Sequence, residues 1–140
     1  MSVLQDAVLV VLVGLLIWRE GSDQPYLVKL AMAYSLIQRT IDKGWWGHDI
    51  LSVIAQPWQY TSMTGVGDPN LIRWPRSEDA SWADSLAAAN AALHATEANP
   101  APTADSYYSL PIEHVPKWAT PSKFLTQIGT VRFYRVGVHG

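Results

Sequence analysis

Glu20 is the residue of this 140-residue chain whose sequence surroundings best suit acid–base chemistry. It follows the apolar run AVLVVLVGLLIW, residues 7–18, and stands before the polar tract SDQP, residues 22–25. An unpaired charge is costly to bury, so this carboxylate either ends a helix in water or is held in a cleft for use. At the end of a buried helix, apolar surroundings and the helix dipole would both raise its pKa, which suits a general acid near neutral pH.

Other kinds of site find little support in the residues. The chain has no cysteine, which excludes thiol nucleophiles, thiolate zinc sites and disulfides, and it lacks the G-x-S-x-G and G-x-x-x-x-G-K patterns. Its four histidines have no metal-ligand spacing, so we expect neither a metal nor a cofactor. With a net charge of −2 and ten scattered Lys and Arg residues, nucleic acid is not expected as a partner.

Tryptophan is unusually frequent, with seven residues in the chain. That number exceeds what routine core filling needs, and the flat faces of aromatic rings are suited to stacking on sugar rings or other planar ligands. Core packing remains the simpler interpretation for about half of them.

The elements that must position these residues begin with a helix over Leu4–Trp18, which lacks a polar face and is therefore expected to be the buried central helix. Its apolar run of about twelve residues is short of the roughly twenty needed to cross a bilayer, so we expect no stable membrane insertion. Asp6 stands where a signal peptide would carry positive charge, and no small-x-small cleavage site follows.

Six further segments complete the expected fold. Ser22 or Asp23 caps a second, amphipathic helix that ends near residues 43–44, and Asp49 caps a short third helix that reaches Ala55. Residues 56–75 form a long ordered loop, an alanine-rich helix starts at Ser81 and reaches residues 99–100, and residues 105–110 and 130–138 form two short strands. The chain is thus expected to be one domain, residues 1–140, mainly α with a small C-terminal sheet (α+β).

Several tracts, in the same order along the chain, resemble the catalytic domain of the spore-cortex-lytic cell-wall hydrolases and their phage and bacterial relatives. WREGSDQP is similar to the family's Y-G-E-A-R-G-E-P, with Glu20 at the catalytic glutamate, and LAMAYSLIQR resembles the helix ending in V-L-N-R, with Arg39 at the arginine. ILSVIAQPWQYTSM resembles I-x-x-V-x-x-Q-P-x-Q-F-S, and ADSYYSLPIEHVPKWA with IGTVRFYRV resembles the closing segments. The chain departs from the family pattern at Arg19, Gln24, Ser106 and Val131.

The resemblance implies a lysozyme-like fold whose cleft binds peptidoglycan glycan strands and cleaves them between N-acetylmuramic acid and N-acetylglucosamine. Because the family's second acid is Gln24 here, a scheme with one carboxylate is favoured: a lytic transglycosylase in which Glu20 is both acid and base and the product has a 1,6-anhydro end. Hydrolysis by the same glutamate, as a muramidase or glucosaminidase, is the near alternative. A non-catalytic wall-binding module of a phage structure is the other.

The resemblance also implies substrate-binding roles. Gln59 and Tyr60 are expected near the scissile bond, Tyr107 and Tyr108 on the opposite wall, and Trp58 and Trp46 as stacking platforms. Strand alternation would allow only one of the two tyrosines to face the cleft. We further expect a monomer that acts in the bacterial cell wall or periplasm, either phage-encoded and released by a holin or a fragment of a larger protein.

Overall fold

The computed structural model describes residues 2–42, 47, 49–56 and 59–137. The helices are α1 (Val3–Gly21), α2 (Tyr26–Ile41), α3 (Ile50–Ala55), α4 (Thr61–Thr64) and α5 (Ala80–His94), with short 3-10 helices η1 (Pro69–Ile72) and η2 (Pro121–Lys123) and strands β1 (Ser106–Ser109), β2 (Phe124–Ile128) and β3 (Val131–Tyr134). The predicted class, mainly α with a small sheet, is confirmed. None of the helices in these ranges is long and apolar enough to cross a membrane.

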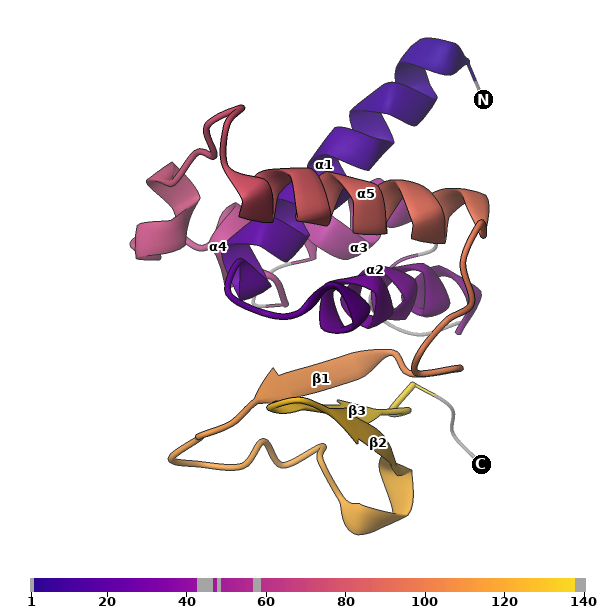
Figure 1. Cartoon of the computed structure of the whole chain (residues 1–140). Coiled ribbons are helices and arrows are strands. Elements are labelled where there is room, and N and C mark those ends of the chain that lie inside the picture. The colour runs from indigo at the N-terminus through magenta and orange to yellow at the C-terminus, as the bar shows by residue number, and fades with distance from the viewer. Residues whose placement is uncertain (1, 43–46, 48, 57–58, 138–140) are drawn as a thin grey trace.

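Helix α2 is the middle layer of the molecule (Figure 1). On one side Leu30, Ala33 and Leu36 pack with the buried residues of α1, α3 and α5. On the other side Val28, Ala31 and Met32 pack on the sheet, against Val131 and Phe133. A helix with two buried faces joins the two parts of the core, so α2, and not the expected Leu4–Trp18 segment, is the central helix.

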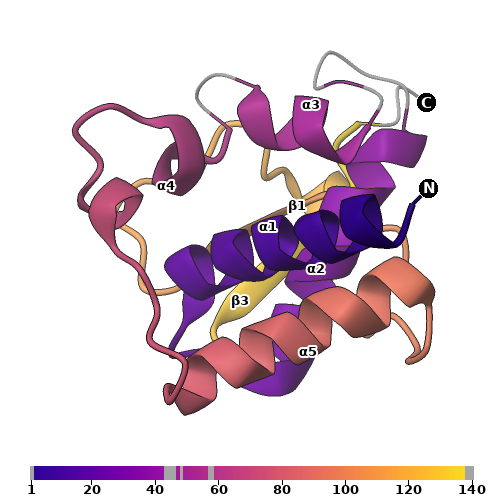
Figure 2. The ribbon, with the colours of Figure 1, turned by 90° about the horizontal axis from the view of Figure 1, so that it is seen from above.

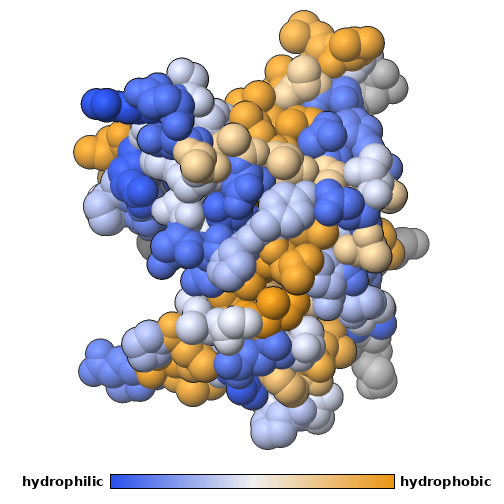
Figure 3. Space-filling view, in the orientation of Figure 1, coloured by the Kyte–Doolittle hydropathy of each residue, from blue (hydrophilic) through white to orange (hydrophobic). Residues whose placement is uncertain are grey.

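Burial of α1 is confined to its second half, which corrects the expectation that Leu4–Trp18 would be almost wholly buried. Residues 13–19 are buried, whereas the side chain of Leu4 is 73% exposed. The helix is longer than the body it crosses, and its first turns project beyond the rest of the fold (Figure 1). Their apolar surface is visible at the top of the space-filling view (Figure 3). Length, rather than polarity, thus decides which part of this apolar helix is covered.

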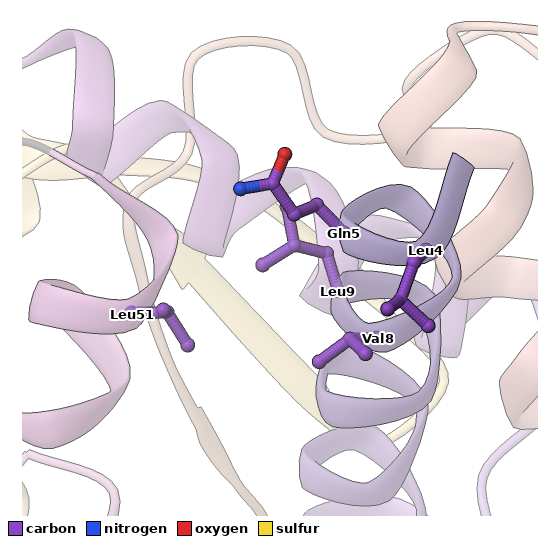
Figure 4. Close-up of a pocket in the computed structure, with 5 residues that line it drawn as sticks. All are labelled: Leu4, Gln5, Val8, Leu9 and Leu51. Atoms are coloured by element: carbon purple, nitrogen blue, oxygen red, sulfur yellow. The ribbon is translucent and has the colours of Figure 1, made fainter. Parts of the chain in front are cut away.

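Helix α5 runs beside α1 and also packs on α2 (Figure 2). The close approach depends on Gly14, where a Cβ atom would come within 3.0 Å of the Leu86 Cδ2 atom. At the end of α5, the His94 Nε2 atom lies 2.9 Å from a carboxylate oxygen of Asp6. An apolar cavity of about 340 Å³ lies between α1 and α3 and is lined by Leu4, Gln5, Val8, Leu9 and Leu51 (Figure 4).

The helix starts differ in part from the prediction. Asp49 caps α3 through its side chain, as expected. Helix α2 begins after Pro25 and has no side-chain cap, so neither Ser22 nor Asp23 caps it as predicted; Ser22 instead ends α1. Helix α5 begins after Asp79, and the Ser81 hydroxyl, expected as its cap, accepts a hydrogen bond from the Trp18 indole at 3.1 Å. That helix ends at His94, several residues before the expected stop.

The sheet has three antiparallel strands in the order β1-β3-β2, one more than the sequence predicted. The two expected strands are β1 and β3, which place Tyr107 opposite Phe133. Strand β2 was missed because its residues, FLTQI, are half exposed and include two polar side chains. Within the 56–75 segment, which was predicted as a loop, α4 and η1 form short helical turns.

The uneven burial of α1 predicts that the same leucine-to-alanine substitution has a large effect on stability in one half of the helix and a small effect in the other. Leu16→Ala should lower the free energy of unfolding by about 2 to 5 kcal/mol, because it leaves a cavity at a side chain that is 1% exposed. Leu4→Ala, on the same helix, should change it by about 0.5 kcal/mol or less, because that side chain is largely in water already. Chemical denaturation of both variants measures the difference, and equal losses would contradict the projecting first half.

Candidate active site

A polar cavity of about 320 Å³ opens between the end of α1, the end of α2 and strand β1. It is lined by Glu20, Arg39, Gln59, Tyr60, Tyr107, Tyr108, Ser109 and Trp118. The surface is hollowed on the side where the α4 segment faces the chain that follows β1 (Figure 3). The apolar cavity beside Leu51 contains no ionisable lining residue, so the polar cavity is the candidate site for chemistry.

Glu20 reaches this cavity from the last turn of α1. Glu20 is exposed at the cavity mouth, but the protein around its carboxyl group desolvates it in part; this desolvation, and then the charge of Asp68, raise its pKa from 4.5 to about 7. The nearby Ser62 hydroxyl and the charge of Arg39 act in the opposite direction. The sequence predicted a raised pKa at this residue from burial and the helix dipole. The neighbouring carboxylate of Asp68 could not be foreseen, because it belongs to a loop 48 positions away.

Asp68 stays ionised at neutral pH, unlike Glu20. Its carboxylate accepts hydrogen bonds from the Asn70 backbone N–H and the Thr61 hydroxyl, both at 2.8 Å. These bonds, together with the charge of Arg19, lower its pKa. The two carboxyl groups therefore differ in state near pH 7: Asp68 is negative, and Glu20 exchanges a proton readily.

Arg39 is a buried cation in the wall of the cavity. Its Nε donates to the Asp105 carbonyl at 2.6 Å, and its Nη1 donates to the Gln59 Oε1 atom at 3.2 Å. The guanidinium also lies 4.9 Å from the centre of the Tyr60 ring. Because Oε1 of Gln59 is engaged in this way, the NH₂ group of the same amide is left to donate to a ligand. Arg39 thus orients two of the predicted site residues.

Two buried tyrosine hydroxyls near Glu20, those of Tyr60 and Tyr107, have no hydrogen-bond partner within the described part of the chain. The third buried hydroxyl, that of Ser62, interacts with the Glu20 carboxyl group. Burial raises the pKa of both tyrosines, so their hydroxyls remain protonated and able to donate. A buried polar group without a partner costs about 1 to 3 kcal/mol, and such groups gather where a polar ligand completes the bonding. The cavity is therefore prepared for a ligand rich in hydroxyl or carbonyl groups.

Of the predicted site residues, Glu20, Gln59, Tyr60, Tyr107 and Tyr108 come together around this one cavity. The two stacking candidates, Trp46 and Trp58, lie outside the described residues. The expectation that only one of Tyr107 and Tyr108 reaches the cleft was wrong, since both line it. Their side chains do alternate, but β1 is an edge strand, so the cavity can contact both faces of the sheet. Tyr60 is also a core residue, more buried than expected.

Trp118 is a lining residue to which the sequence analysis gave no role. Its ring lies edge-on to Tyr108, with centroids 6.2 Å apart, and to Tyr134, with centroids 5.5 Å apart. It belongs to the PKWA tract, which carries part of the family resemblance, so a signal was present in the sequence. Asp68, in contrast, had no such signal, because only the fold brings its loop to Glu20.

The raised pKa predicts how stability depends on pH. Between its ordinary value of 4.5 and about 7, Glu20 binds more protons in the folded than in the unfolded chain, so stability should fall as the pH rises through this window. Glu20→Gln removes that loss and should be more stable than the parent at pH 8 by about 1 kcal/mol, a value reduced for solvent screening. Denaturation at pH 4 and pH 8 measures it; an equal stability difference at both values would contradict the assigned pKa.

Comparison with known proteins gave one family. The family model described as cell wall hydrolase matches residues 23–134, which include every lining residue of the polar cavity except Glu20. Searches of curated proteins and of solved structures returned no match. Because the matched residues make up well over half of the chain, it belongs to the cell wall hydrolase family.

Proposed function

We propose that this protein cleaves the glycan strands of peptidoglycan between N-acetylmuramic acid and N-acetylglucosamine, with Glu20 as the catalytic acid. The observation that carries the proposal is a carboxyl group with a pKa of about 7 in a polar cavity. Family membership, which indicates an enzyme that acts on the cell wall, supplies the substrate class. The resemblance of WREGSDQP to the family's catalytic tract supports the role of Glu20, which precedes the matched residues.

In the proposed reaction, the protonated Glu20 gives its proton to the glycosidic oxygen as the bond between that oxygen and C1 of the muramic residue breaks. Positive charge then develops on the sugar ring, and the substrate's own acetamido oxygen stabilises it. The Glu20 carboxylate next removes the proton from the C6 hydroxyl, whose oxygen bonds to C1. The products are a 1,6-anhydro end and a free 4-hydroxyl group. No water is consumed, and Glu20 is protonated again.

The other lining residues bind the strand in this scheme. The Gln59 amide and the hydroxyls of Tyr60 and Tyr107 donate hydrogen bonds to sugar hydroxyl and acetamido groups. The rings of Tyr108 and Trp118 offer half-buried aromatic surface for a sugar face. The site then works as a lysozyme-like cleft, in a protein that acts as a monomer on the cell wall. Nucleic acid has no part in this function.

One observation favours plain hydrolysis as the second candidate. Asp68 is an ionised carboxylate that acts on Glu20 electrostatically, and an acid beside an ionised carboxylate is the usual pairing of a hydrolytic glycosidase. Asp68 is not among the residues that line the cavity, however. The scheme with one carboxylate therefore remains the leading proposal.

Glu20→Gln tests the function directly. It keeps the size of the side chain but cannot transfer a proton, so release of soluble muropeptides from sacculi should fall by at least about 10² to 10⁴, while binding to sacculi persists. Glu113→Gln is the matched control, because Glu113 is 90% exposed and lies outside the cavity, and it should retain the parent rate. A Glu20→Gln variant that digests sacculi as fast as the parent would exclude Glu20 as the acid.

The products of the same digestion separate the candidates. Mass spectrometry should find 1,6-anhydro ends, whereas reducing ends that borohydride can label would favour hydrolysis. A parent protein that binds sacculi and releases nothing would instead favour a non-catalytic wall-binding module.

Tyr60→Phe tests the unpartnered hydroxyl groups. Removing a buried hydroxyl without a partner should leave the melting temperature unchanged or slightly higher, while turnover falls by about tenfold because one donor to the substrate is lost. This variant is preferable to Tyr60→Ala, which would also remove the ring from the core. Thermal melts and initial rates on the same preparation measure both effects. A melting temperature that falls while turnover is unchanged would assign the hydroxyl to the fold.

A further inference from the structure

The side chain of Arg19, adjacent to Glu20 in α1, binds backbone carbonyl groups of the segment formed by residues 61–74. Its guanidinium donates to the carbonyls of Arg73 at 3.0 Å, Leu71 at 3.1 Å and Ser62 at 3.1 Å. The Arg19 side chain is buried, and the interactions connect α1 to both ends of a segment that is otherwise half exposed. Three carbonyls held by one planar cation form a specific attachment, because only arginine offers donors in this fork.

Two reciprocal arginine–tryptophan contacts reinforce the attachment. The Arg19 guanidinium lies 4.7 Å from the centre of the Trp74 ring, and the Arg73 guanidinium lies 4.6 Å from the centre of the Trp18 ring. Each helix residue thus pairs with a residue of the 61–74 segment, and Trp18 is itself fixed by its hydrogen bond to Ser81. The segment is therefore held by arginine–tryptophan contacts at its C-terminal end as well as by the hydrogen bonds of Arg19 to its carbonyls.

Two groups of the segment, the Asp68 carboxylate and the Ser62 hydroxyl, act on Glu20. Inside the segment, Asp68 is fixed by the Thr61 hydroxyl and the Asn70 N–H, so it moves with the segment as one unit. The other charged or titratable groups that face Glu20 are Arg39 on α2, Tyr60 before α4, and Tyr107 on β1. None of these is bound by Arg19, so Arg19 can influence Glu20 selectively through the 61–74 segment.

We propose that Arg19 is a positioning residue that holds the 61–74 segment against the end of α1 and thereby sets the pH range in which Glu20 can donate a proton. The proposal rests on the proposed function for its catalytic consequence, but the positioning itself does not. Arg19 is not among the residues that line the cavity.

The direction of the effect follows from the groups involved. If the segment loosens, the Glu20 carboxyl group becomes more fully hydrated and Asp68 moves away, and both changes lower the pKa of Glu20. Losing the Ser62 hydroxyl would raise it, but desolvation and Asp68 are the two largest influences. The net change is therefore a lower pKa. An acid that loses its proton at lower pH also stops working at lower pH, so the alkaline limb of the activity profile moves in the acidic direction.

The experiment compares Arg19→Met and Arg19→Lys with the parent. Carbon-13 NMR of the glutamate carboxyl groups, with Glu20→Gln to assign the signal, gives the titration midpoint without any substrate. We expect the midpoint to fall by about one pH unit in Arg19→Met. Arg19→Lys should also lower it, because an ammonium group cannot bond three divergent carbonyls. Arg76→Met is the matched control: it removes an exposed arginine outside the attachment and should leave the midpoint unchanged.

Two further variants keep the test decisive. If Arg19→Met does not fold, Trp74→Ala loosens the same attachment at a side chain that is 69% exposed, and it should lower the midpoint in the same direction. Asp68→Asn removes the charge without loosening the segment and should lower the midpoint with the fold intact. An unchanged midpoint in a folded Arg19 or Trp74 variant would overturn the proposal.

The pH profile of sacculus digestion then links positioning to catalysis. Failure of the proposed function and failure of the further inference give different results. If Glu20→Gln remains active, the proposed function is wrong, whereas the NMR midpoints still decide whether Arg19 positions the segment. If Glu20→Gln is inactive while the Arg19 variants keep the parent midpoint and profile, only the further inference is wrong.

Discussion

The rotation of α1 about its own axis is the constraint on which the site depends. Adjacent residues of a helix point about 100° apart, so fixing one side chain fixes the direction of the next. The buried residues Val13, Leu16 and Ile17 set the rotation by facing α2 and α5. Arg19 is then directed under the 61–74 segment, and Glu20 is directed into the polar cavity. One helix orientation, set by apolar burial, thus supplies both the candidate acid and the attachment of the loop beside it.

Helix α2 plays the corresponding part on the other side of the cavity. Because helices cover one face of α2 and the sheet covers the other, α2 fixes the position of β1 relative to the end of α1. Arg39 near its end connects the two layers, since it bonds the Asp105 carbonyl just before β1 and the Gln59 amide just before α4. The cavity is therefore built where the two parts of the core meet, and its walls come from segments far apart in the sequence.

Local pattern and resemblance predicted much of this arrangement, and tertiary contacts account for the rest. Glu20, Gln59 and the tyrosine pair line one cavity, as their short contiguous tracts suggested, while their roles stay predictions; the cap at Asp49 was predictable because a cap acts within one turn. The projecting half of α1 was missed because the hydrophobicity of a helix does not show how far the elements that pack on it extend along its length. The influence of Asp68, the edge position of β1 and the bonds of Arg19 all join distant segments, which spacing within one segment cannot reveal.

The polar groups around Glu20 are locally unfavourable, and the core compensates for them elsewhere. A partly desolvated carboxyl group and two buried tyrosine hydroxyls without partners among the described residues each lower the stability of the fold. Burial of fully covered apolar side chains such as Leu16, Leu36 and Phe133 contributes about 1.5 to 3 kcal/mol each, which offsets such losses. The unfavourable groups are concentrated at the end of one helix, where Arg19 and Arg39 fix their neighbours in place. Under the proposed function, a site preorganised in this way would offer a glycan strand donors that are already oriented and an acid with a pKa of about 7.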